Sequence, residues 1–148
     1  MLRAGCSGFP VARSSYFRRL GAVEIVSSFL KPPKPETART WREEAPSDFD
    51  FCVQAWQRIT HLPSSPSYAR AGEKDAKAVA RCGHFKPSDE VQRAWQATAE
   101  LAETLRARFV LFRTASTFYP NADHLRDMYR FFKAVRRRTF ALAWEPRG

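Results

Sequence analysis

Residues Phe49 to His61 read Phe-Asp-Phe-Cys-Val-Gln-Ala-Trp-Gln-Arg-Ile-Thr-His, and this stretch decides how the rest of the chain is interpreted. Apolar side chains recur at every second position in its first half, a period that indicates a β-strand. They are Phe49, Phe51, Val53 and Ala55. Cys52 and Trp56 in the other register are also apolar, so both faces of this strand are expected to be covered, as in a parallel sheet.

Four hydrogen-bonding side chains follow this strand directly: Gln57, Arg58, Thr60 and His61. Parallel α/β folds build their sites at the carboxyl ends of strands, so we expect a site here. His61 is a candidate proton shuttle because imidazole titrates near neutral pH. Arg58 is a candidate clamp for a phosphate or carboxylate, and Gln57 is a candidate substrate contact. For His61 the open alternative is an ordinary loop histidine.

Strand-like and helix-like segments alternate along the whole chain. The expected strands cover residues 2–6, 22–26, 49–55, 109–112 and 139–143. The expected helices cover residues 13–20, 36–44, 89–107 and 122–138, and residues 62–87 are expected to form a long functional loop with a short helix near 73–80. No hairpin turn joins two strands, so parallel crossovers are predicted. The fold is therefore α/β, either an open doubly wound sheet or a partial TIM-barrel-like sheet with outer helices.

The last expected helix has a clear apolar spacing of three and four residues. Its predicted buried face consists of Leu125, Met128, Tyr129, Phe132 and Val135. Asn121 is expected to cap its amino end. Three arginines, Arg136, Arg137 and Arg138, are expected to close it, where they complement the helix dipole.

Composition points to a globular protein with an anionic partner. The chain is 44% hydrophobic, and 25 Lys and Arg against 15 Asp and Glu give a formal net charge of +10. That excess favours an anionic small molecule or nucleic acid, although a solvated basic exterior is the alternative. The three cysteines fit neither a zinc pattern nor a disulfide framework, so a cytoplasmic location is predicted. No apolar run approaches membrane-spanning length, and no membrane partner is expected.

Two carboxylates are candidates for chemistry. Glu24 interrupts an apolar strand, and burying it unpaired would be costly. It is therefore either a structural partner of an arginine or an acid/base group. Glu145 follows the fifth strand, with Arg147 two residues later as a candidate anion clamp. Two acids at strand ends suit acid/base work, and no metal site is predicted because the three histidines are scattered.

Five short motifs occur in the order seen in a known family. They are Gly5-Cys6-Ser7-Gly8-Phe9, Val23-Glu24-Ile25 followed by Ser27-Ser28-Phe29, Trp56 to His61, Leu111-Phe112 with Phe118, and Trp144-Glu145-Pro146-Arg147-Gly148. Together they make the chain resemble the YecE-like family, domain of unknown function 72. The resemblance implies a TIM-barrel-like fold without an established activity or cofactor. It places Glu24, Arg58, His61, Glu145 and Arg147 on motif positions.

The resemblance also marks one substrate-binding candidate, Arg113, at a position where the family commonly has Gln. The chain is expected to be a single domain, residues 1–148, that corresponds to the amino-terminal portion of a barrel, because a full (β/α)₈ barrel takes about 250 residues. The first and fifth strands would then have open edges, which favour self-association.

Two functions are predicted from these features. The first is a barrel enzyme that acts on a phosphorylated or other anionic substrate, with acid/base residues at the carboxyl ends of its strands. The alternative is a non-catalytic nucleic-acid-binding protein that uses its basic surface. The first needs positive charge focused in one mouth, and the second needs it spread across the exterior.

Overall fold

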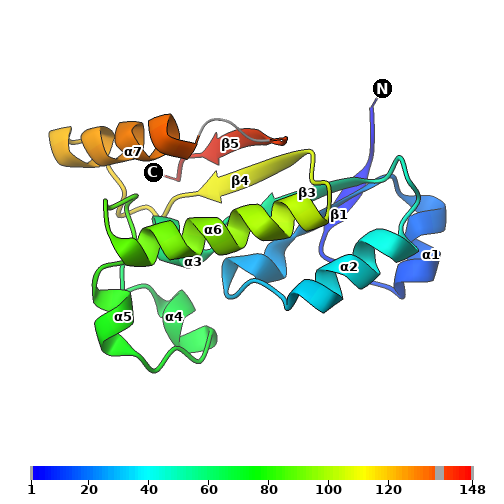
Figure 1. Ribbon diagram of the computed structural model, residues 1–148, viewed down its shortest axis with the longest axis horizontal. Coiled ribbons are helices and arrows are strands. Elements are labelled where there is room, and N and C mark those ends of the chain that lie inside the picture. Colours follow the sequence, from blue (N-terminus) through cyan, green and yellow to red (C-terminus); the bar gives the residue numbers. More distant parts are fainter. Residues whose placement is uncertain (1, 136–138, 148) are drawn as a thin grey trace.

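The computed structural model describes residues 2–135 and 139–147, and its centre is one parallel sheet (Figure 1). The strand order is β1-β2-β3-β4-β5. The strands are β1 (Gly5–Ser7), β2 (Ala22–Ile25), β3 (Asp50–Gln54), β4 (Phe109–Arg113) and β5 (Ala141–Glu145). Every neighbouring pair is parallel, so the predicted α/β fold with five parallel strands in sequential order is confirmed.

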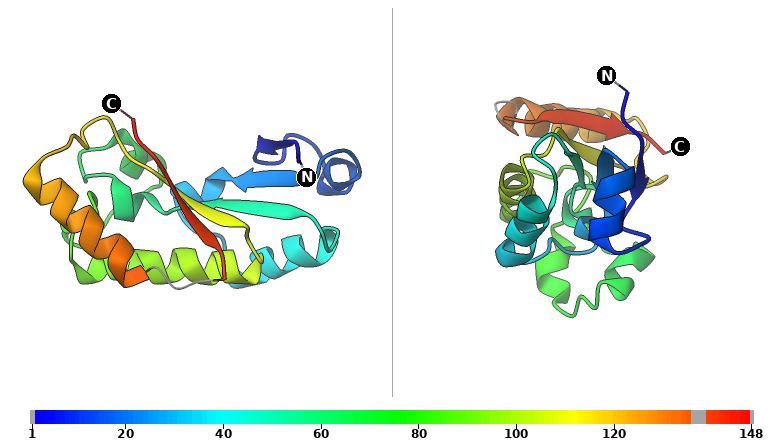
Figure 2. Two further views of the ribbon diagram at one scale, coloured as in Figure 1. Left: turned by 90° about the horizontal axis from the view of Figure 1, so that it is seen from above. Right: turned by 90° about the vertical axis from the view of Figure 1, so that its right-hand side faces the viewer.

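Helices and helical turns connect the strands. They are α1 (Arg13–Arg19), the 3₁₀ turn η1 (Val26–Phe29), α2 (Pro35–Glu44), α3 (Gln57–Thr60), α4 (Pro66–Arg70), α5 (Ala76–Ala80), α6 (Asp89–Thr104) and α7 (Ala122–Val135). Figure 2 shows α2, α6 and α7 side by side along one face of the sheet. In the part of the chain that is described, no helix is both long and apolar enough to cross a membrane.

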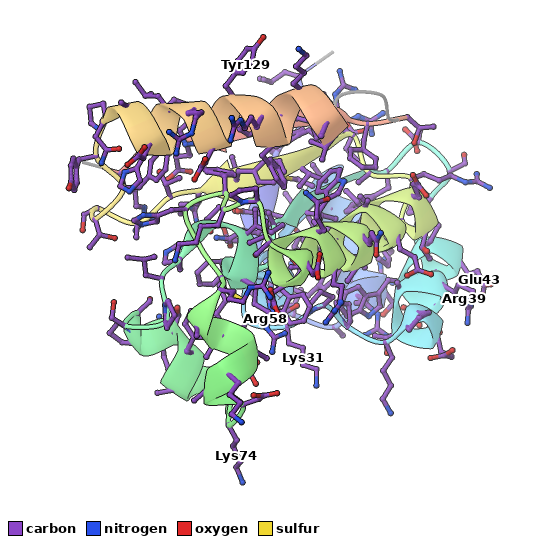
Figure 3. The ribbon with its side chains drawn as sticks, turned by 60° about the vertical axis from the view of Figure 1, so that its left-hand side comes forward. Lys31, Arg39, Glu43, Arg58, Lys74 and Tyr129 are labelled. Atoms are coloured by element: carbon purple, nitrogen blue, oxygen red, sulfur yellow. The ribbon has the colours of Figure 1, made fainter. Side chains whose placement is uncertain are left out.

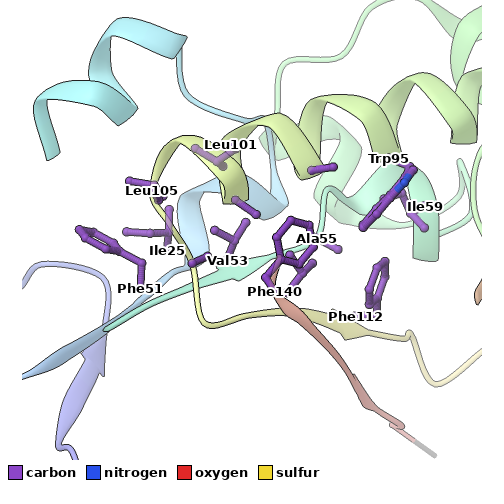
Figure 4. Packing of buried hydrophobic residues seen from close by; sticks show 14 of the residues in the cluster. Ile25, Phe51, Val53, Ala55, Ile59, Trp95, Leu101, Leu105, Phe112 and Phe140 are labelled. Carbon is purple, nitrogen blue, oxygen red and sulfur yellow. The ribbon is translucent and has the colours of Figure 1, made fainter. Parts of the chain in front are cut away.

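The hydrophobic core lies between the sheet and α6 (Figure 4). The alternation of strand side chains sends one register into this layer, which explains the period-two pattern of β3. Buried members from the strands are Val23, Ile25, Phe51, Val53, Val110 and Phe112. From α6, Trp95 and Leu101 pack onto them, and the Ser88 hydroxyl caps the helix by accepting a hydrogen bond from the Val91 amide at 3.3 Å.

The edge strands differ from the predicted bounds by a few residues. β1 begins only at Gly5, because its pairing with β2 starts where Gly5 faces Ala22. β5 lies two residues later than the predicted range 139–143, because its pairing with β4 starts where Ala141 faces Phe109 and continues to Glu145, opposite Arg113. The inner strand β2 ends at Ile25, one position earlier than predicted, because the 3₁₀ turn η1 begins at the next residue.

The buried face of α7 was predicted only in part. Val135 is buried, as expected, but Leu125 and Tyr129 are 48% and 66% exposed, which contradicts the predicted stripe. Tyr129 projects away from the sheet in Figure 3. Phe131 is buried instead, because its ring packs against an aromatic cluster that includes Phe112, 5.6 Å away, and this contact sets the rotation of the helix. The predicted closing residues Arg136 to Arg138 lie outside the described residues.

Residues 62–87 are more ordered than a single loop. They contain α4, which was not predicted, and α5, which lies within the predicted short helix. Both helices have side-chain caps: the Ser65 hydroxyl accepts from the Ser67 amide, and the Asp75 carboxylate accepts from the Ala78 amide. Figure 1 shows α4 and α5 as a small lobe on the side of the molecule toward which the strands point.

Candidate functional site

Parallel strands carry their carboxyl ends to one edge of the sheet, and here all five strands end in or next to a polar side chain, including Gln54 on β3. Ser7 on β1 lies opposite Glu24 on β2, and Arg113 on β4 lies opposite Glu145 on β5. The Ser7 hydroxyl donates a hydrogen bond of 2.8 Å to Oε2 of Glu24. The alternation of the strands points these side chains away from the helical core.

Arg113 joins the two carboxylates of this edge. Its Nε and Nη2 donate to Oε1 and Oε2 of Glu145 at 2.9 and 3.0 Å, and its Nη2 lies 3.6 Å from Oε1 of Glu24. Arg147 adds a longer contact of 3.5 Å from Nε to Oε1 of Glu145. Acids and bases thus alternate across the strand ends. The hydrogen bonds from Arg113, followed by the charges of both arginines, hold the pKa of Glu145 below its usual value.

One carboxylate oxygen of Glu24 lacks a hydrogen-bond donor among the described residues. Its Oε1 is buried and accepts no hydrogen bond from the described residues, and 3.6 Å is too far for one from Arg113. The side chain is 18% exposed, so water has limited access. A buried carboxylate oxygen without a donor is costly, and a ligand that carries a donor would relieve this cost.

His61 follows α3 at the same edge. The Thr60 hydroxyl lies 2.8 Å from its Nδ1, and the ring of Phe29 packs edge-on against the imidazole at 4.8 Å. Burial, and to a smaller extent the positive charge of Arg147, lowers the pKa of His61 to about 4. The imidazole is therefore neutral at physiological pH, and its unprotonated ring nitrogen is available to accept a proton.

A cleft of about 380 Å³ lies over these groups. Its lining is rich in hydroxyls and guanidiniums and includes Ser7, His61, Ser65, Ser67, Arg70, Arg113 and Arg147. A second hollow of about 410 Å³ adjoins it, because both contain His61, Ser65 and Arg147. The second hollow adds Ser116 and Thr117 from the segment after β4. We call the two hollows together the strand-end cleft.

The structure does not bring Arg58 into this cleft. Its guanidinium forms an ion pair with Glu73, between α4 and α5, and lies over the ring of Trp56, 4.7 Å from the centroid. Figure 3 shows Arg58 beside the lobe. Gln57 is 1% exposed and donates to the carbonyls of Leu30 and Ser67 at 3.3 and 3.4 Å. Both side chains hold the segments that form the cleft wall together.

Sequence reasoning missed Arg70, Ser65, Ser67 and Thr117. Arg70 is exposed on α4, lines the cleft and has no acidic partner among the described residues. It was missed because α4 was read as loop. The signal was nevertheless present, since Ser65 followed by Pro66 is a helix start with a capping hydroxyl and proline in the first turn.

Another hollow lies on the sheet face opposite the helices. It has a volume of about 450 Å³ and is lined by inner-face residues of the strands such as Ala22, Cys52, Phe109 and Leu111. Its charged lining includes Glu24 near the carboxyl end of β2, which lies 3.6 Å from Arg113, and Asp50 at the amino end of β3, which pairs with Arg3 at 3.2 Å. Because these charges are already paired and the remaining lining is largely apolar, the strand-end cleft is the better candidate site.

No group of three or more His, Cys, Asp or Glu side chains is placed to hold a metal ion within residues 2–135 and 139–147. The polar groups that line the strand-end cleft are instead guanidinium, hydroxyl, amide and imidazole groups, and the carboxylates of Glu24 and Glu145 lie beside it against Arg113. This set suits an anion better than a cation.

The chain belongs to the family described as "Protein of unknown function DUF72", which its sequence matches over residues 12–148; this is the YecE-like family that the motifs indicated. Two crystal structures of a DUF72 family protein from Enterococcus faecalis V583 have the same TIM-barrel-like fold. One gives a TM-score of 0.67 at 20% identity, over 100% of this chain and 52% of that chain. The other gives 0.71 at 17% identity, over 99% and 51%. This chain thus spans about half the length of those structures. No curated protein matches the sequence.

Proposed function

We propose that the strand-end cleft binds a small anionic substrate, phosphorylated or carrying a carboxylate, and that acid/base side chains in and beside the cleft act on it. The observation that carries this proposal is the meeting of Arg70, Arg113 and Arg147 with several hydroxyls around one cleft. Guanidinium groups bind phosphate and carboxylate in paired hydrogen bonds, and hydroxyls supply further donors.

The charge balance of the cleft supports an anion. Three guanidiniums stand against the carboxylates of Glu24 and Glu145, while His61 is neutral at pH 7, so one positive charge is left over. Arg70 carries the charge that no described carboxylate balances. A bound anion would complete this balance in a partly buried setting, where charge interactions are stronger than in bulk water.

The two predicted catalytic carboxylates have different roles in this proposal. Glu24 is the acid/base group, because its Oε1 has no hydrogen-bond donor from the described residues. Glu145 is bound by Arg113 and Arg147, which keep it ionised, so it orients the two arginines toward the substrate. His61 is the neutral proton shuttle beside Arg147. Arg58 and Gln57 act indirectly by holding the cleft wall.

The remaining proposals concern setting and assembly. The outer strands β1 and β5 have one unpaired edge each, and all three residues of β1 are exposed. We propose that these edges pair with a complementary set of strands, as expected for the amino-terminal portion of a barrel, and that without it the chain self-associates.

The three free cysteines support a cytoplasmic location.

The proposal is tested by a binding screen that compares anion classes. Inorganic phosphate, a set of sugar phosphates, a set of dicarboxylates and a single-stranded oligonucleotide are titrated into the wild type, Arg70→Ala and Arg39→Ala. Arg39 pairs with Glu36 on the surface of α2 and is the matched control. Small-anion binding that Arg70→Ala weakens and Arg39→Ala spares supports the proposal. Oligonucleotide binding alone, weakened by both variants and falling steeply with salt, would favour the nucleic-acid alternative.

A further inference from the structure

A pair of histidines that the proposed function does not use lies next to the strand-end cleft. Nδ1 of His84 is 3.0 Å from Nε2 of His124, and the two rings meet edge to face at 4.5 Å. His84 is 4% exposed, so its hydrogen bonds are made with the protein. The pair brings together residues 40 positions apart, from the end of the 62–87 segment and from α7.

The tautomer of His124 follows from its other nitrogen. Nδ1 of His124 lies 2.8 Å from the main-chain carbonyl oxygen of Tyr119, which can only accept. This nitrogen therefore carries the proton. The Asn121 amide nitrogen is also near Nδ1, but at 3.3 Å, because the Asn121 oxygen is held by the His124 main-chain amide at 2.8 Å. The shorter contact with an obligate acceptor decides the assignment.

The tautomer of His84 then follows from that of His124. With its proton on Nδ1, the His124 ring presents Nε2 as an acceptor, so Nδ1 of His84 donates to it. Nε2 of a neutral His84 is consequently unprotonated and accepts from the Thr117 hydroxyl, whose oxygen is 3.4 Å away. His84 is neutral at pH 7 because burial lowers its pKa to about 4, with further electrostatic contributions from His124, Lys86 and His61.

The segment that carries His84 is firmly held. Its main-chain amide donates to the Thr60 carbonyl, and the Gly83 amide donates to the Arg58 carbonyl at 2.8 Å. Gly83 has φ of 87°, and a Cβ there would lie 2.3 Å from the His61 carbonyl oxygen, so only glycine fits. His84 itself has φ of 52°, an uncommon conformation for a non-glycine residue that the surrounding contacts hold in place.

We propose that Thr117, His84 and His124 form a proton relay that serves the strand-end cleft. Thr117 lines the cleft beside His61 and Arg147, and its hydroxyl is the exposed end of the relay. His84 is the base behind it. His124 is a positioning residue, because it keeps the His84 proton on Nδ1 and leaves Nε2 free to accept. The group that gives up a proton is a water or a hydroxyl of a molecule bound in the cleft.

The proton transfer balances within these groups. The bound hydroxyl or water gives its proton to Oγ1 of Thr117 as the Thr117 proton passes to Nε2 of His84. This leaves an alkoxide or hydroxide in the cleft and an imidazolium at His84, whose Nδ1–H donates to His124. Reversal of the same steps returns the proton to the product. No oxidant, reductant or metal takes part.

The proposal is tested by nitrogen-15 NMR of the histidine rings in the full 148-residue chain. At pH 7 we expect a neutral His84 ring with its proton on Nδ1, and a proton on Nδ1 of His124. A proton on Nε2 of His84, or an imidazolium at pH 7, would overturn the relay. His124→Leu should allow His84 to change tautomer, and His124→Gln, which keeps an acceptor near the Nε2 position, should preserve it.

A second set of variants separates a relay from a merely structural pair. Thr117→Val removes the hydroxyl and keeps the side-chain shape, so the neutral His84 loses a donor and its pKa should shift upward; Thr117→Ser should restore the wild-type titration. No shift in Thr117→Val would show that the relay does not reach the cleft. The result is independent of the proposed anion site, because Arg70→Ala should leave both tautomers unchanged while it alters phosphate binding.

Discussion

Arg113 and Glu145 face each other across β4 and β5 and are joined by two hydrogen bonds of 2.9 and 3.0 Å. Parallel pairing brings the last polar residue of each strand to the same edge of the sheet, so a base on one strand meets an acid on the next. Glu24 extends the row on β2, at 3.6 Å from Arg113. Glu24 and Glu145, which the sequence suggested as catalytic acids, and Arg113, which it suggested as a substrate contact, are thus partners of one another.

Removing Arg113 should destabilise the carboxyl-terminal edge of the sheet, where it joins Glu145 and Glu24. Arg113→Gln takes away the donor pair of Glu145 and the positive charge beside Glu24. Because both side chains of the pair are partly exposed, we expect a loss of about 1 kcal/mol in unfolding free energy. Urea denaturation measures it. Arg39→Gln, which breaks an exposed pair with Glu36 on α2, is the control and should change stability by less; equal losses would contradict the account.

Replacing Arg58 should affect the lobe rather than ligand binding. Arg58→Ala leaves Glu73, whose side chain is 20% exposed, without its ion-pair partner. We expect a loss of about 1–3 kcal/mol and faster hydrogen exchange in α4 and α5. A variant that keeps its stability and exchange rates but no longer binds phosphate would instead make Arg58 the anion clamp that the sequence suggested.

Stability should fall as the solution becomes acidic, starting above the range of ordinary carboxylates. His61 and His84 have pKa values of about 4 in the folded protein against an ordinary value of 6.5. Between these values the unfolded chain binds protons that the folded chain does not, so unfolding becomes more favourable as pH falls from about 6.5 to about 4. Melting temperatures across this range measure the effect.

The control for this pH dependence is His84→Asn. Asparagine tolerates the positive φ of His84 and keeps a donor near the Nδ1 position, but it does not titrate. The loss of stability between pH 6.5 and 4 should become smaller in this variant. An unchanged slope would show that His84 does not have a lowered pKa in the folded protein.

The two faces of α7 should respond differently to truncation. Phe131 is 3% exposed, so Phe131→Ala should cost about 3–5 kcal/mol through lost burial and a cavity. Tyr129 is 66% exposed, and Tyr129→Ala should change stability by less than about 0.5 kcal/mol. Chemical denaturation of the two variants decides the orientation of the helix. A larger loss of unfolding free energy for Tyr129→Ala than for Phe131→Ala would instead support the buried face that the sequence predicted.

Local patterns were sufficient to predict the sheet. The alternation in β3 and the absence of hairpin turns reflect main-chain geometry and burial, which act over a few residues, and they correctly gave five parallel strands in order. The rotation of α7 could not be predicted, because it depends on the packing of Phe131 against Phe112, two residues from different elements.

The candidate site was predictable where it follows strand ends and not elsewhere. Glu24, Arg113 and Glu145 come together because each ends or lies within a parallel strand. Arg58 comes from a helical turn, α3, and points to Glu73, a partner that becomes visible only once the lobe is folded. Arg70 was not predicted as a site residue because residues 62–87 were expected to form a loop. Ser65 and Pro66 nevertheless mark the start of the helix that carries it.

The central claim is that the arginine-lined strand-end cleft binds an anion, and calorimetric titration of inorganic phosphate and sugar phosphates tests it most directly. Arg70 has no described acidic partner, so Arg70→Ala takes one guanidinium out of the cleft without leaving a described carboxylate unpaired. The account predicts saturable binding of at least one of these anions to the wild type, weakened about tenfold in Arg70→Ala, which corresponds to about 1.4 kcal/mol, and unchanged in Arg39→Ala. Absence of binding to the wild type, or equal affinity in Arg70→Ala, would contradict it.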